Sequence, residues 1–73
     1  MYYIIKLVCI SKNNPYNLPL NKEVWISDVF GTENKYNKDK SRAYQFLSLQ
    51  RAQSIAQKIN TNHIFHPIII KTY

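Results

Sequence analysis

Three segments of the chain have the apolar patterns that β-strands require. Residues 1–10 are rich in β-branched and aromatic side chains, and both faces of the segment are largely apolar. Residues 23–30 alternate between apolar and polar side chains, and residues 63–73 form an apolar tail that contains Pro67. Because proline cannot donate a ladder hydrogen bond, the tail is predicted to be an edge strand or a strand with an irregular start. The first segment, with two apolar faces, is predicted to be central or to have one face covered by another subunit.

A helix pattern occupies the stretch FLSLQRAQSIAQKIN. Ser48 is predicted to cap the free amides of a helix that begins at Leu49, and Asn60 or Asn62 is predicted to close it. Apolar residues then recur at spacings that place them on one side of the helix, which suits packing flat on a sheet. This stripe consists of Leu49, Ala52, Ile55, Ala56 and Ile59.

Two connections separate these elements. Residues 11–22 contain two prolines and four asparagines, so they are predicted to form a loop. Residues 32–42 are strongly charged, and only Tyr36 among them suits a core, so a mobile, solvated loop is expected. Residues 1–73 are therefore predicted to be a single α+β domain of order β-β-α-β. Its three-stranded, mainly antiparallel sheet would carry one helix on one face.

The charge and the single cysteine indicate what kind of partner the protein binds and in which compartment it works. Ten Lys and Arg residues against four Asp and Glu residues give a net charge of +6, which favours anionic partners. Cys9, the one cysteine, lies in an apolar strand and is predicted to be a buried, inert thiol. The lone cysteine and the lack of a signal peptide predict a cytoplasmic protein. The apolar run at the start falls well short of the ~20 residues of a membrane span.

Catalytic and metal-binding patterns are weak. A phosphate cradle of the glycine-rich kind needs several glycines, and the chain has one. The four acidic residues are scattered, and His63 and His66 would lie on opposite faces of a strand. We therefore expect no enzymatic activity, no cofactor and no metal site.

A basic and aromatic set offers a candidate binding site for an anion. Lysine and arginine side chains bind phosphate groups, and an aromatic ring stacks on a base. An alternative is that these charges only solvate a loop, with Tyr36 folded onto the core. The candidate ligand-binding residues are Lys35, Tyr36, Lys38, Lys40, Arg42 and Arg51.

The segments YYIIK, EVWISD and FLSLQRAQSIAQKI together resemble small accessory proteins of bacteriophages that infect Gram-positive bacteria. In those proteins a hairpin precedes a capped helix, and the matching positions here are Phe46, Ser48, Ala52, Ile55 and Ala56. The chain departs from them in its longer basic loop and in Arg51, where they usually have an acid. The resemblance implies a non-enzymatic protein of the host cytoplasm that counters a defence by capturing a nucleotide signal or a defence protein.

Other functions and assemblies remain open at this point. A nucleic-acid-binding regulator would use the same basic side chains on a phosphate backbone, with steep salt dependence. A structural or assembly protein is a third possibility. The apolar tail would be an exposed sheet edge in so short a chain, so we expect another subunit to cover it in a homo-oligomer.

Overall fold

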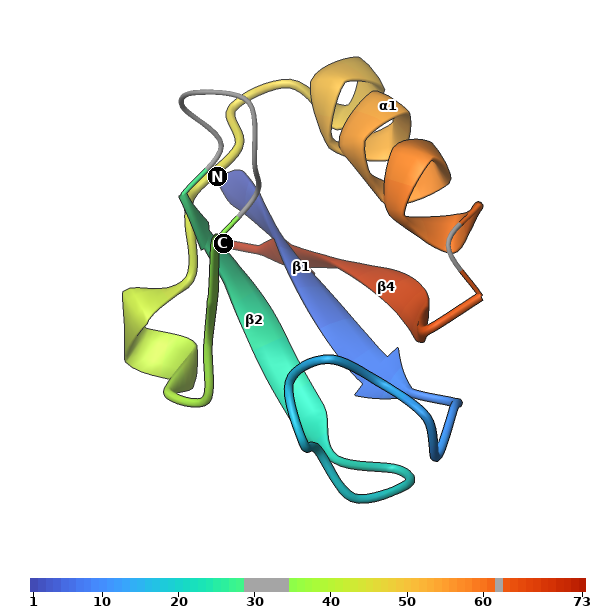
Figure 1. Cartoon of the computed structure of the whole chain (residues 1–73). Coiled ribbons are helices and arrows are strands. Elements are labelled where there is room, and N and C mark those ends of the chain that lie inside the picture. The colour runs from blue at the N-terminus through green and yellow to red at the C-terminus, as the bar shows by residue number, and fades with distance from the viewer. Residues whose placement is uncertain (29–34, 62) are drawn as a thin grey trace.

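The computed structural model describes residues 1–28, 35–61 and 63–73. The fold is α+β, with one helix packed on an antiparallel sheet (Figure 1). In chain order the elements are β1 (Tyr2–Cys9), β2 (Glu23–Asp28), β3 (Lys35–Asn37), a 3₁₀ helix η1 (Lys40–Arg42), α1 (Leu49–Asn60) and β4 (Phe65–Thr72).

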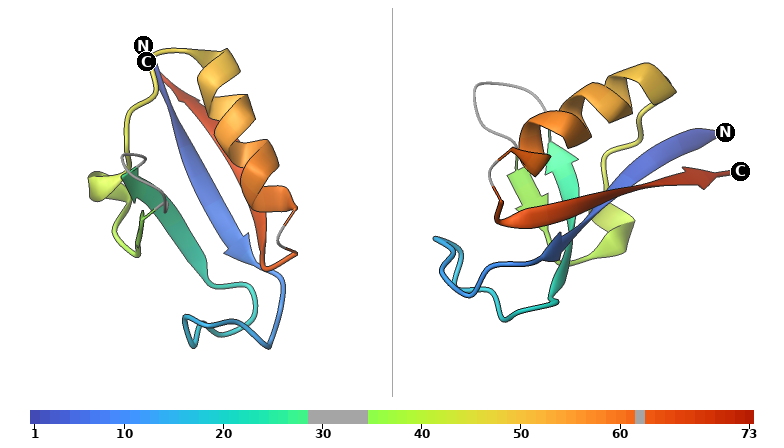
Figure 2. Two further views of the ribbon diagram at one scale, coloured as in Figure 1. Left: turned by 45° about the horizontal axis from the view of Figure 1, so that its top comes forward. Right: turned by 90° about the vertical axis from the view of Figure 1, so that its right-hand side faces the viewer.

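The sheet has four strands in the order β3-β2-β1-β4. The central place of β1 and the edge place of β4 are both confirmed. Pairing of Tyr2 with Thr72 brings the two ends of the chain side by side (Figure 2). The Cys9 side chain is fully buried, as predicted.

The prediction of three strands is wrong, because β3 lies within the segment that was expected to be a loop. Its pairing with β2 places Tyr36 beside Ile26 and Asn37 beside Trp25, with a register shift before Asp28. A strand of three residues with one apolar side chain shows no alternation, so the sequence pattern could not indicate it. Residues 29–34, including the predicted end of the second strand, lie outside the described residues.

Helix α1 begins and ends where the sequence predicts. The Ser48 side chain accepts a hydrogen bond from the Arg51 amide (3.3 Å), and the helix ends at Asn60. The helix lies over β4 and β1 and buries Ala52, Ala56 and Ile59 (Figure 2). Ile55 is half-buried.

The placement of Leu49 within the buried stripe is wrong, because this residue is 43% exposed. The angular position of Leu49 on the helix does not explain this, because at 100° per residue Leu49 lies nearer the centre of the three buried residues than the half-buried Ile55 does. Leu49 is instead the first residue of the helix, where the side chain has no preceding helical turn beside it. Asn62, the second predicted helix end, lies outside the described residues.

Residues 38–42, which were also predicted to belong to a mobile, solvated loop, are folded as well. The η1 helix covers the sheet face opposite α1, where Lys40 Nζ lies 5.5 Å from the centroid of the buried Trp25 ring. The chain then passes to the other face along backbone hydrogen bonds. The Tyr44 amide donates to the Ile26 carbonyl (2.7 Å), and Phe46 and Tyr3 exchange a pair of bonds (2.7 and 2.8 Å).

Residues 11–22 form a loop, as predicted. Asn17 (φ 55°) and Asn21 (φ 69°) adopt the left-handed conformation that asparagine tolerates well. Within the described parts of the chain, no helix is long and apolar enough to cross a membrane.

Candidate functional site: a tyrosine-lined pocket beside β3

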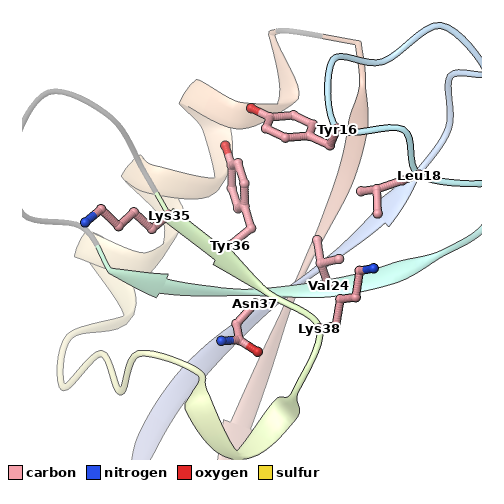
Figure 3. A pocket seen from close by; sticks show the side chains of 7 residues that line it. All are labelled: Tyr16, Leu18, Val24, Lys35, Tyr36, Asn37 and Lys38. Atoms are coloured by element: carbon pink, nitrogen blue, oxygen red, sulfur yellow. The ribbon is translucent and has the colours of Figure 1, made fainter.

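A pocket of about 400 Å³ opens beside β3 (Figure 3). It lies on the α1 side of the sheet, over the strands that the helix leaves free, since α1 packs on β4 and β1. Its lining consists of Tyr16 and Leu18 from the 11–22 loop, Val24 from β2, and residues 35–38.

Three aromatic rings form one side of this region. The Tyr36 ring centroid lies 5.3 Å from that of Phe65 and 5.5 Å from that of Tyr16, and Phe65 and Tyr16 are 5.7 Å apart. Tyr36 and Phe65 come from the two edge strands, so the sheet must curl for their rings to meet. Phe65 is buried, whereas Tyr16 is 47% exposed. The cluster therefore packs the half-buried Tyr36 against the core and leaves Tyr16 partly open to solvent.

Asn14 holds the loop that supplies Tyr16 and Leu18. Its Oδ1 accepts hydrogen bonds from the amides of Tyr16 (3.1 Å) and Leu18 (2.9 Å). Its Nδ2 donates to the carbonyls of Ser11 (3.0 Å) and Leu18 (2.9 Å). One half-buried side chain thus satisfies backbone donors and acceptors on both sides of the turn.

Replacing Asn14 by aspartate should lower the free energy of unfolding by about 1–3 kcal/mol, the usual cost of unsatisfied buried hydrogen-bonding groups. The shape and the acceptor oxygen are kept, but an acceptor then faces the carbonyls of Ser11 and Leu18. Asn13→Asp is the matched control, because Asn13 is exposed. Urea denaturation of the two variants measures the difference. Identical midpoints would mean that Asn14 does not hold the loop.

The structure brings part of the predicted site together. Lys35, Tyr36 and Lys38 all line the pocket. Figure 3 shows the Tyr36 and Tyr16 rings pointing toward each other, with Lys38 beside Val24 and Lys35 extending away from the rings. The pocket therefore combines the phenol rings of Tyr16 and Tyr36 with two lysines, Lys35 at the start of β3 and Lys38 directly after it.

The other predicted residues lie elsewhere. Lys40 and Arg42 belong to η1 on the opposite face of the sheet, and Lys40 borders a separate hollow beside Tyr2 and Ile4. Arg51 is an exposed residue of α1, which Figure 1 shows at the other end of the fold from η1. The predicted cations are therefore spread over several surfaces.

Asp39 lies between Lys38 and Lys40 in the sequence and reduces the local positive charge. The Ser41 amide donates to Asp39 Oδ1 (3.0 Å), and this backbone hydrogen bond is the main cause that lowers the pKa of Asp39 from its ordinary 3.8. The Ser41 hydroxyl and the charge of Arg42 act in the same direction. Asp39 therefore caps η1 as a carboxylate near neutral pH.

Sequence reasoning missed the contribution of the 11–22 loop to the pocket. The stretch NNPYNL contains a signal that was available, because an asparagine before proline favours a side-chain-stabilised turn. That signal predicts a turn, but it does not predict which strand the turn will face.

No family model, no curated protein and no solved structure matches this chain. The resemblance to phage accessory proteins therefore stays a prediction. What bears on function is the geometry of the pocket.

Proposed function

We propose that this chain is a non-enzymatic binding protein whose pocket captures a compact ligand with a flat aromatic ring and an anionic group, as in a mononucleotide. The observation that supports this best is the meeting of Tyr16 and Tyr36 with Lys35 and Lys38 around one hollow of about 400 Å³. Each side-chain type matches one half of such a ligand.

The tyrosines suit the aromatic half of the ligand. Tyr36 is fixed against the buried Phe65 ring, so it presents a surface that is already ordered before binding. Tyr16 is partly exposed and lies edge-to-face with Tyr36 at an interplanar angle of 85°. Stacking of a base on such a ring contributes about 1–3 kcal/mol.

The lysines suit the anionic half. Lys35 and Lys38 are both exposed, so binding an anion requires little loss of their own contacts. Each ammonium group sits on a flexible four-carbon stem, which lets Lys35 turn toward a ligand from its outward position. Charge-assisted hydrogen bonds from lysine to phosphate are stronger than neutral ones.

Capture rather than catalysis fits the chemistry of the lining. The residues that the structure places around the pocket are tyrosine, lysine, asparagine, leucine and valine. Among these lining residues there is no carboxylate, imidazole or thiol to act as a general base or nucleophile near neutral pH.

A compact ligand fits better than a long strand of nucleic acid. A volume of about 400 Å³ lies near the lower end of the ~300–1,000 Å³ that small-molecule pockets occupy. A strand would need a continuous basic track, whereas Lys40, Arg42 and Arg51 lie away from the pocket. In the phage setting that the sequence resemblance suggests, capture of a nucleotide signal would silence a host defence stoichiometrically.

Isothermal titration calorimetry with the four ribonucleoside 5′-monophosphates tests the proposal. We expect at least one to bind at one site per chain, and its nucleoside and inorganic phosphate each to bind at least about tenfold more weakly. Between 50 and 200 mM salt, two phosphate contacts predict a loss of less than about tenfold. The absence of binding by all four at millimolar concentration would overturn the proposal. Tight, steeply salt-dependent binding of single-stranded oligonucleotides instead would favour the nucleic-acid-binding regulator.

A further inference from the structure

The outer edge of β4 carries backbone groups that point away from the sheet. The Ile10 amide donates to the Ile64 carbonyl (2.9 Å), so these two residues form a hydrogen-bonded pair. Along the register of β1 and β4, hydrogen-bonded pairs and non-hydrogen-bonded pairs alternate from this pair. His66, Ile68, Ile70 and Thr72 therefore bond to β1. The backbone groups of Phe65, Pro67, Ile69 and Lys71 point outward.

This alternation explains where the proline lies. Pro67 lacks an amide hydrogen and occupies an outward position, so it removes no bond from the ladder with β1. Within the part of the chain that the structure describes, no strand lies beyond β4, and no loop backbone group bonds to Ile69 or Lys71. Between Pro67 and Lys71, two amides and three carbonyls on this edge are thus available to another strand.

We propose that β4 pairs antiparallel with β4 of a second copy of this chain, around a two-fold axis beside Ile70. In this register Ile69 lies opposite the second copy's Lys71, and Lys71 lies opposite the second copy's Ile69. In each pair, the amide of one residue donates to the carbonyl of the other. The Tyr73 amide would reach the carbonyl of the second copy's Pro67. The two four-stranded sheets then become one continuous sheet.

Two neighbouring registers are less favourable. An axis beside Ile69 would place Pro67 inside the new ladder, opposite Lys71, and leave the Lys71 carbonyl without a donor. An axis beside Lys71 would put two ammonium side chains directly opposite each other, which is destabilising. The axis beside Ile70 places Pro67 at the end of the ladder and Ile70 against its counterpart.

The side chains of β4 also suit a copy of itself. On the sheet face away from α1, Ile68 is 37% exposed and Ile70 is half-buried. Pairing beside Ile70 joins the two apolar rows, and β4 itself has one lysine and no acid among its eight residues. The net charge of +6 per chain opposes association, so added salt should strengthen the dimer, whereas it should weaken anion binding in the pocket.

Cysteine cross-linking tests the register. At an axis beside Ile70, the two Cα atoms lie about 4.5 Å apart, within disulfide range. Ile70→Cys should therefore form a disulfide-linked dimer under mild oxidation. Ile68→Cys should not, although Ile68 is more exposed on the same face, because its counterpart lies far along the strand. Native Cys9 is buried and should not react. Equal cross-linking of the two variants, or none in Ile70→Cys, would overturn this register.

Sedimentation equilibrium tests the dimer itself. Wild-type protein and Lys71→Gln should be dimers at micromolar concentration. Lys71→Pro should sediment as a monomer, because it removes an outward amide. Its circular dichroism spectrum should be that of the folded protein, because the change otherwise removes only an exposed side chain. A monomeric wild type at all salt concentrations would overturn the proposal and leave the edge to a strand of another protein. A dimeric Lys71→Pro variant would place the interface elsewhere.

Discussion

Replacing Ala52 by aspartate is expected to lower the free energy of unfolding by about 3–5 kcal/mol, the usual effect of an uncompensated buried charge. Ala52 is fully buried where α1 packs on the sheet, and its small side chain leaves no room for a hydrated carboxylate. A domain of this size has a total stability of only about 4–11 kcal/mol. The variant should therefore be close to unfolding at room temperature.

Gln53→Asp is the matched control for Ala52→Asp. Gln53 is the next residue along the helix and is exposed, so the same charge stays in water. We expect its free energy of unfolding to change by less than about 0.5 kcal/mol. Urea denaturation followed by circular dichroism measures both variants. Equal midpoints would contradict the packing of α1 described above.

Replacing Lys35 and Lys38 together by glutamine is expected to weaken mononucleotide binding by about tenfold or more, since each charge-assisted contact contributes well over the ~1 kcal/mol of a neutral one. Both side chains are exposed, so the free energy of unfolding should change by only ~0–1 kcal/mol per residue. Calorimetric titration with the tightest-binding nucleotide gives the change in affinity.

The double change Lys40→Gln with Arg42→Gln removes the same amount of charge from η1, outside the pocket. If the pocket binds the ligand, this control should lose less than about threefold in affinity, through the weakened long-range field alone. Equal losses in the two double variants would show that general positive charge, rather than the pocket, attracts the anion. Unchanged affinity in both double variants would show that Lys35 and Lys38 do not contact the ligand.

Apolar runs and a clear helical period allowed the main elements to be predicted. The apolar strand at residues 1–10, the edge strand with Pro67 and the helix capped by Ser48 all lie where the sequence places them. The helix has apolar side chains that repeat at the helical spacing, whereas the two strands were predicted from runs of β-branched and aromatic residues and from Pro67.

The pocket could be predicted only in part, because it depends on contacts between distant segments. Tyr36 stood out as the one apolar residue of a charged segment, but its strand β3 forms by pairing with β2 rather than by its own pattern. Tyr16 reaches the pocket because Asn14 shapes a loop far from Tyr36 in the sequence. A contact between such distant segments leaves no periodic pattern in the sequence, so Tyr16, one of the two tyrosines of the pocket, was missed.

The measurement that tests the binding pocket most directly is a ¹H–¹⁵N correlation spectrum recorded during titration with the nucleotide that binds most tightly. Binding in the pocket predicts saturable shifts of the amides of Tyr16, Leu18, Tyr36 and Lys38, which line it. The amides of Arg42 and Arg51 should stay in place, because these residues lie on other surfaces. Shifts at Arg42 and Arg51 without shifts at Tyr16 and Tyr36 would contradict the pocket as the binding site.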